Sequence, residues 1–373
     1  MSSNQVLSII LKRRTRWIAQ LSCALVLSIA LGTVVAQSQI NLPCGYKEKE
    51  CAAKAARMHP AIKLETWKKA FQMPLKDRVG APPQEVVEFL HLGVILSGSS
   101  RRPRAADPDS DFINDVRQAV SELPTAITRT LSAQLAGIFI VEDINGTAWA
   151  EQIFDSKGKP VAGMLVLHKA WLVGQTANSW ASWKEGTPFT PHPSFRLTMR
   201  IASEAENNRK NAIQYILLHE LGHVFSVGRN VHPPWNDAPK DIASTEEYPY
   251  FLLSWSISIE QNRYVTKFDD NVFPQRRNIH YYDDMPKLPA DQMVSVYQNL
   301  ERTNLPTLYA SEHPADDFAD AYVTYVHTVL MKKPFLIAIY EDDSIVKTYK
   351  ACWSEERCAE KRRILERLLG LRD

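Results

Sequence analysis

Two histidines and a glutamate occupy a five-residue stretch, His219-Glu220-Leu221-Gly222-His223, at the end of an apolar run. The run, NAIQYILL at 211–218, carries apolar residues at helical spacing. Residues four apart lie on one face of a helix, so both imidazoles could bind one ion. A catalytic zinc usually keeps three protein ligands and one water. Glu220 could take a proton from that water as it attacks a carbonyl.

The alternative is an ordinary core helix whose two histidines are hydrogen-bonded and bind no metal. A buried, unpaired Glu220 between them would then cost free energy. Gly222 lies inside the helix, where glycine costs about 1 kcal/mol relative to alanine, so something other than helix stability accounts for it. These points favour a metal site, and the five-residue pattern resembles that of the zincin metallopeptidases. The metzincin subclass is excluded, because it would have Gly at 226 and His at 229, where this chain has Ser226 and Arg229.

A second stretch, Asp316-Asp-Phe-Ala-Asp-Ala-Tyr322, lies in a predicted helix over 315–329. It is similar to the acid-x-Phe-Ala-acid-Ala-aromatic helix of the gluzincin peptidases. The resemblance implies that Asp316 is the third zinc ligand and that Asp320 supports a ligand histidine through its other nitrogen. Most gluzincins have Glu at the ligand position, so with the shorter Asp the helix must approach about 1 Å closer.

Three alternatives to Asp316 stay open: Asp317, Glu312, or no third protein ligand. Asp316 and Asp317 could instead only stabilise the helix, because acidic residues in the first turn interact favourably with the helix dipole. This explanation applies poorly to Asp320, which lies deeper in the helix. Tyr309, seven residues before Asp316, resembles a tyrosine just upstream of the ligand helix in the toxin-like branch of the gluzincins. The resemblance implies that its hydroxyl donates to the oxyanion of the reaction; a buried structural tyrosine is the alternative.

The N-terminus looks like an export signal. Lys12, Arg13, Arg14 and Arg16 precede an apolar stretch over 17–35, and Val34-Val35-Ala36 would suit signal peptidase. Residues 1–36 are therefore a signal peptide or, if uncleaved, a membrane anchor. The protein is expected to be exported, periplasmic or secreted. The 373-residue chain has 44 basic and 42 acidic residues. Without the four basic residues of this segment the balance is 40 to 42, which gives no reason to expect a nucleic-acid partner.

Four cysteines remain after cleavage, and an even number in an exported chain suggests two disulfides. If each pair lay in one continuous helix, local bridges would be too long, and Cys44–Cys358 with Cys51–Cys352 would fit. If Cys44 and Cys352 lie in turns before their helices, two local bridges are equally possible. A four-cysteine zinc cluster has the wrong spacing.

The chain divides into a helical N-terminal cap or removable pro-segment at 37–96, a Ser-, Pro- and Arg-rich linker at 97–110, and a catalytic domain at 111–373. Helices are predicted over 47–58, 62–71, 83–96, 110–123 and 126–135. Strands are predicted over 136–142, 147–154, 161–173 and 195–201, with a hairpin turn at Asn145-Gly146. A capping box of Ser203 with Glu206 would begin the motif helix, Gly228 would end it, and a C-terminal helix would cover 354–371.

This order predicts an α+β, zincin-like catalytic domain, in which a small mixed sheet packs on the active-site helix and a mainly helical subdomain follows. The resemblance implies a zinc endopeptidase with His219, His223 and Asp316 as ligands, Glu220 as general base and Tyr309 as oxyanion donor. Its substrate would be a protein or peptide, or a peptidoglycan cross-link, and nothing in the sequence indicates the oligomeric state. The rival predictions are a non-catalytic zinc-binding or recognition module and an interaction domain that binds no zinc.

Overall fold

The computed structural model describes residues 43–371, except 46, 108, 236, 283, 284 and 286. The predicted signal peptide or anchor at 1–36 lies outside the described residues. Residues 41–373 form one compact unit with α+β architecture, as predicted, and no unit begins or ends at the predicted boundaries near 96 and 110. Among the described residues, no helix is long and apolar enough to cross a membrane.

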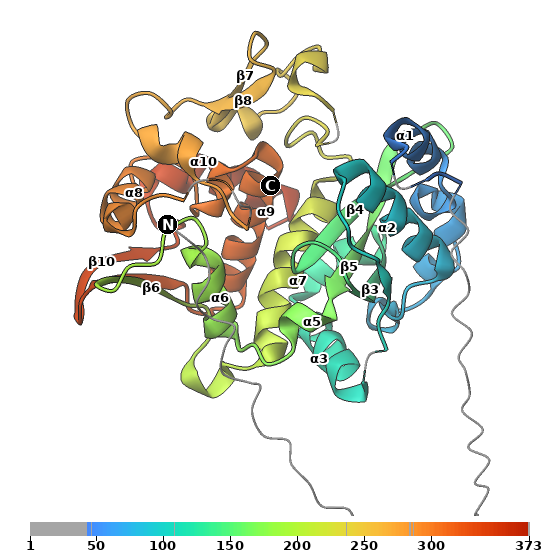
Figure 1. Ribbon diagram of the computed structural model, residues 1–373, viewed down its shortest axis with the longest axis horizontal. Coiled ribbons are helices and arrows are strands. Elements are labelled where there is room, and N and C mark those ends of the chain that lie inside the picture. The colour runs from blue at the N-terminus through green and yellow to red at the C-terminus, as the bar shows by residue number, and fades with distance from the viewer. Residues whose placement is uncertain are drawn as a thin grey trace, which may run out of the picture. The chain divides into compact units, whose positions relative to one another are not determined.

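The α-helices of the described residues run in chain order through the whole unit (Figure 1). They are α1 Lys49–Met58, α2 Gln84–Ser97, α3 Ser110–Ser121, α4 Thr125–Ser132, α5 Lys169–Leu172, α6 Ala177–Gly186, α7 Arg209–Ser226, α8 Met293–Leu300, α9 Pro314–Tyr325 and α10 Ala359–Leu368. Five-residue π-helical turns at Val326–Leu330 continue α9.

The strands form three separate sheets. The largest contains β1 Val79–Gly80, β2 Arg104–Ala105, β3 Leu135–Glu142, β4 Ala148–Phe154 and β5 Pro160–His168, in the order β1-β3-β5-β4 with β2 also on β3. The second contains β6 Phe195–Arg200, β9 Leu336–Glu341 and β10 Ser344–Lys350, and the third contains β7 Trp255–Ser258 and β8 Arg263–Thr266. The strand predicted over 195–201 therefore belongs to another sheet than β3, β4 and β5.

The predicted hairpin at Asn145-Gly146 is wrong. β3 pairs with β5 in parallel, and β4 pairs with β5 antiparallel, so β5 lies between the two strands expected to be neighbours. The turn is present, with Gly146 at φ 73°, but the connection from Glu142 to Ala148 is longer than a two-residue hairpin loop. β3 is almost continuously buried, which is typical of an inner strand with a parallel neighbour.

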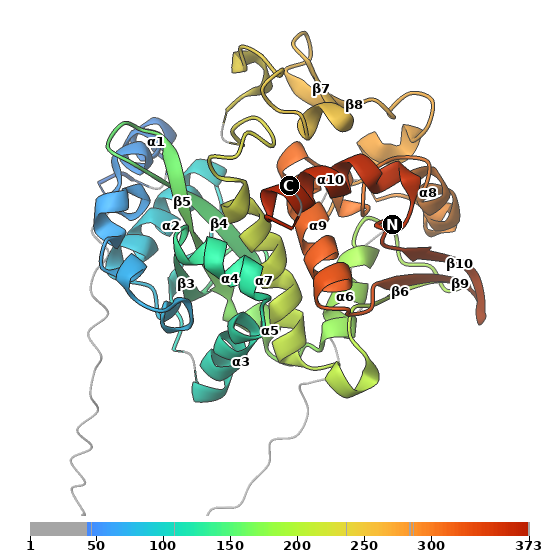
Figure 2. The same cartoon turned by 180° about the vertical axis from the view of Figure 1, so that it is seen from behind.

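Opposite faces of this sheet pack on different parts of the chain. Ile138 and Ile140 face the core that contains α3, α4, α7 and α9, whereas Phe139 and Val141 face α2 and the segment 60–71. Figures 1 and 2 both show α7 between the sheet and α9, with α2 on the sheet's other side. The N-terminal segment thus covers a face of the sheet and also supplies β1.

Two helix predictions need correction. In place of one helix over 62–71, the chain forms short 3₁₀ turns at Pro60–Ile62, Leu64–Trp67 and Ala70–Gln72, and side chains bond back to carbonyls at the start of the segment. For example, the Trp67 indole donates to the Ala61 carbonyl at 2.8 Å. The motif helix α7 begins later than a Ser203–Glu206 capping box requires, and the Asn208 side chain accepts from the Asn211 N–H as its N-cap. Gly228, at φ 74°, follows its end as predicted.

Both disulfides are local: Cys44 bonds Cys51 and Cys352 bonds Cys358. Cys44 precedes α1, and Cys352 lies in a turn before the C-terminal helix, so each bridge closes a turn onto a helix start. This is the second of the two predicted arrangements. Paired cysteines are typical of proteins that fold in an oxidising, exported compartment.

Gly222 lies where α7 crosses α9. A Cβ atom built at Gly222 would lie 2.8 Å from the Ala319 Cα and 3.1 Å from the Ala319 carbonyl oxygen. These are backbone atoms that cannot rotate away, so only glycine permits this helix separation. The crossing therefore explains the glycine inside α7.

Replacing Gly222 by alanine should force α7 and α9 apart. Overpacking of this kind costs about 1–3 kcal/mol, which exceeds the gain of up to about 1 kcal/mol in helix propensity. We expect a lower free energy of unfolding in urea. Gly186→Ala is the matched control, since no atom lies within 4 Å of a Cβ at that helical position. Equal stability of the two variants would contradict this explanation of the crossing.

Candidate metal centre

Two helices bring three potential ligands together. His219 and His223 project from successive turns of α7, and Asp316 lies in the first turn of α9. The two Nε2 atoms are 3.3 Å apart, and Asp316 Oδ1 lies 3.7 Å from His219 Nε2 and 3.5 Å from His223 Nε2. Together they form a group that could hold a metal ion. In a tetrahedral zinc site each ligand atom lies about 2.0–2.2 Å from the metal, so the ligand atoms lie roughly 3.3–3.6 Å from one another. The distances between the three ligand atoms here are close to this range and therefore fit zinc.

Asp320 fixes the orientation of His219. Its Oδ1 lies 2.7 Å from His219 Nδ1, and the Thr307 hydroxyl donates to its other oxygen. With Nδ1 as the donor in this bond, the neutral ring keeps its lone pair on Nε2, which faces the other two ligand atoms. Asp320 was predicted to contact a ligand histidine, and that histidine is His219. A carboxylate of this kind is the usual outer partner of a ligating histidine.

The electrostatics of the group favour a bound cation. Burial lowers the pKa of His219, but hydrogen bonds to Asp316 and Asp320 outweigh it and raise the pKa to about 10. Burial of Asp316 raises its pKa, but its contacts with His219 and His223 dominate and hold it well below the usual range. Two imidazole nitrogens and a carboxylate oxygen this close together need a proton or a metal ion between them.

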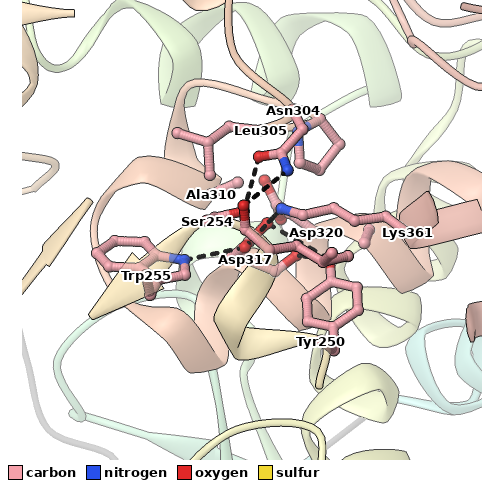
Figure 3. A network of polar contacts seen from close by, with 12 residues as sticks. Tyr250, Ser254, Trp255, Asn304, Leu305, Ala310, Asp317, Asp320 and Lys361 are labelled. Carbon is pink, nitrogen blue, oxygen red and sulfur yellow. Dashed lines mark hydrogen bonds and ion pairs between the residues drawn. The ribbon is translucent and has the colours of Figure 1, made fainter. Parts of the chain in front are cut away.

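Asp317 is bonded to Lys361 and Trp255, away from the two histidines (Figure 3). Its carboxylate oxygens both lie 2.6 Å from the Lys361 ammonium, and Oδ2 also accepts from the Trp255 indole at 2.9 Å. Asp317 and Lys361 are fully buried. Glu312 is not part of the group either. Of the three acids considered from the sequence, the geometry thus brings only Asp316 to the two histidines.

Glu220 lies next to His219 in the same cleft and is 9% exposed. Burial raises the pKa of Glu220, while the charges of His219 and His223 oppose the rise. A carboxylate held at this boundary between core and cleft can exchange a proton with a molecule in the cleft.

Tyr309 lies beside His219, with the ring centroids 5.5 Å apart, and it lines the same cleft. Burial and the charge of Asp316 raise the pKa of Tyr309 well above its ordinary value. The hydroxyl therefore stays protonated and can act as a donor. This is compatible with the predicted role as oxyanion donor.

Other residues of the site were missed in the sequence. His313 caps α9: its Nδ1 accepts from the Ala315 N–H, so Nε2 carries the hydrogen of the neutral ring. Trp235 packs edge-on against His223, with ring centroids 5.3 Å apart, and Lys184 places its ammonium 3.9 Å from the Tyr309 ring centroid. A helix-capping residue and isolated aromatic residues follow no recognisable sequence pattern. The His313-Pro314 pair before the acidic turn, however, could have indicated a role for His313.

The cleft at the centre has a volume of about 720 Å³, and residues 148–151 of β4 form part of its wall. β4 is the last strand of its sheet and pairs with β5 on one side. At Phe154 its other side is covered by a bridge to Lys63. Among the described residues no strand pairs with this edge at 148–151, so an open strand edge runs along the cleft next to the metal centre.

Comparison with family models, with curated proteins and with solved structures gave no match for this chain.

Substitutions of the neighbouring residues Asp316 and Asp317 should have different effects on zinc affinity and on stability. Asp316→Asn should lower zinc affinity by more than the roughly 10–100-fold that loss of an outer partner costs, because it removes a ligand oxygen charge. Asp317→Asn should leave zinc affinity close to that of the parent but destabilise the fold by roughly 3–5 kcal/mol, since Lys361 stays buried without its partner. Competition with a zinc chelator and urea unfolding measure the two effects, and the reverse pattern would exclude Asp316.

Glu151, in the wall of the cleft, should make stability depend on pH. Burial raises the pKa of Glu151 to about 7 from its ordinary value near 4.5, although the hydrogen bond from the Gln152 N–H lowers it. A raised pKa stabilises the fold while the carboxyl is protonated, and this contribution is lost as pH rises from about 4.5 through 7. Glu151→Gln should therefore stabilise the protein more at pH 8 than at pH 4.5. Thermal midpoints at both values, with Glu260→Gln as control, test this; a pH-independent difference would contradict it.

Proposed function

We propose that the protein is an exported zinc-dependent endopeptidase of gluzincin type on a zincin-like scaffold. The observation that carries the proposal is the convergence of His219, His223 and Asp316 on one point, with Glu220 beside them in an open cleft. Two disulfides and the N-terminal signal or anchor support export. The α+β core, with a sheet on one side of α7 and helices on the other, is compatible with this scaffold.

The roles follow from the positions of the side chains. His219, His223 and Asp316 would hold zinc, which when bound polarises a carbonyl and makes water more acidic. Glu220 takes a proton from the attacking water and later gives it to the leaving amine. Asp320 keeps His219 in the tautomer that leaves Nε2 unprotonated, and Tyr309 donates to the oxygen that gains charge.

The uncovered edge of β4 suggests how a substrate binds. An extended peptide could add to this edge as a further strand, with main-chain hydrogen bonds that do not depend on its sequence. Residues 148–151 would then align the peptide past Glu220. A cleft open along a strand edge suits cleavage inside a chain, and this supports an endopeptidase with a protein or peptide substrate.

Replacing Glu220 by glutamine should separate metal binding from catalysis. The variant should keep about one zinc per chain, since the ligands are unchanged, while peptide hydrolysis falls by roughly 10²–10⁴-fold with the loss of the general base. Metal analysis and a peptide-library assay by mass spectrometry measure both. Unchanged hydrolysis would disprove the mechanism. Full zinc content with no turnover even in the parent protein would instead support a non-catalytic zinc-binding module.

A further inference from the structure

A smaller cavity of about 160 Å³ adjoins the metal centre between α6, α7 and the residues just before β4. We call it the lysine pocket. Its wall contains the aromatic side chains of Trp180, Tyr215, Tyr282 and Tyr309 together with the ammonium-bearing Lys184. The cavity has room for a single side chain, and it opens beside His219 and Glu220.

Lys184 is 8% exposed, yet its ammonium makes no hydrogen bond or ion pair with another residue in the part of the chain that the structure describes. Its contact is with the face of Tyr309, at 3.9 Å from the ring centroid. The charges of Glu185, Asp320 and Glu220 act on it from nearby, but no carboxylate of the described residues lies at ion-pair distance from its ammonium. A buried cation that faces a cavity is therefore suited to bind an anion that enters it.

Two of these three carboxylates are hydrogen-bonded to other donors. Glu185 accepts from the Tyr297 hydroxyl, and Asp320 accepts from His219 and Thr307. Their charges help to keep a lysine cation in this interior, but they leave the three N–H donors of the ammonium for another acceptor. Glu220 also lines the pocket, and its proposed role directs it to the reacting water and the leaving amine.

The position of the pocket identifies which part of a substrate would enter it. Glu220 must reach the leaving amine, so the residue after the scissile bond lies on the Glu220 side of the centre. The lysine pocket touches Glu220 and His219 but not His223 or Asp316. It also touches residues 146–148, at the start of β4. A peptide antiparallel to β4 would run toward that end, which places its later residues there.

We propose that the lysine pocket binds a substrate carboxylate, carried by the residue that follows the scissile bond. This inference rests on the proposed endopeptidase function and adds a specificity for the substrate residue after the scissile bond. The carboxylate could be the side chain of Asp or Glu, or the terminal carboxylate of a chain that ends at that residue. In both cases Lys184 would form a charge-assisted hydrogen bond in an aromatic, largely water-excluded pocket.

The test uses the purified mature protein and matched peptides that differ only after the scissile bond: Glu or Gln with the chain continuing, and a terminal residue with a free or amidated carboxylate. The parent protein should prefer one acidic member of these pairs by roughly 10–100-fold in kcat/KM. Lys184→Met should abolish the preference and Lys184→Arg should retain part of it. Lys347→Met, at a surface ion pair with Glu301, is the control that should keep it. Ratios within one variant cancel general losses of activity.

A binding measurement gives a second readout. In the Glu220→Gln protein, isothermal titration calorimetry should report tighter binding of the acidic peptide, and Lys184→Met should remove this difference. A preference for internal Glu or for a free terminus distinguishes the two carboxylate sources, and each supports the proposal. Glu220-dependent hydrolysis without any acidic preference, or a preference that survives Lys184→Met, would overturn the inference alone. Absence of Glu220-dependent hydrolysis would overturn the function and the inference together.

Discussion

The close contact between Gly222 of α7 and Ala319 of α9 is the constraint on which the candidate site depends. It sets the separation of the two helices that carry all three potential ligands. Next to this contact, Phe225 of α7 stacks on Phe318 of α9 with nearly parallel rings. Asp316 has a short side chain, so its carboxylate reaches the histidines only because the helices lie this close. A glycine facing an alanine at the crossing provides that approach.

Two buried polar networks then fix α9 in rotation. On the side of the site, Asp320 joins His219 to Thr307. On the side of the core, Asp317 joins Lys361 of α10 to Trp255 of β7, as Figure 3 shows. A buried ion pair is costly unless its remaining lone pairs are also bonded, and here Trp255 supplies such a bond. Neighbouring aspartates thus have opposite functions, since one faces the cleft and the next anchors the helix.

The parts of this arrangement that are local in sequence could be predicted. The motif helix and its face with two histidines follow from helical periodicity, whereas the contact of Asp320 with a ligand histidine was implied by the resemblance of the segment 316–322. The resemblance favoured Asp316, but helix geometry alone left Asp317 open, because adjacent residues differ by about 100° around a helix and the packing partner Lys361 decides the rotation. The strand order failed for a similar reason, since the Asn145-Gly146 turn carries no information about which strand inserts beside β3. Lys184 gave no signal at all, as its importance comes from a cavity built by distant segments.

Several features therefore converge on the same point: a glycine that permits close packing, a carboxylate that orients an imidazole, and an uncovered strand edge beside them. Anomalous X-ray diffraction at the zinc absorption edge, on crystals of the mature protein, tests this account most directly. The account predicts a single strong anomalous peak about 2 Å from His219 Nε2, His223 Nε2 and a carboxylate oxygen of Asp316. Absence of a peak there in zinc-supplemented crystals, or a peak held by other residues, would contradict it.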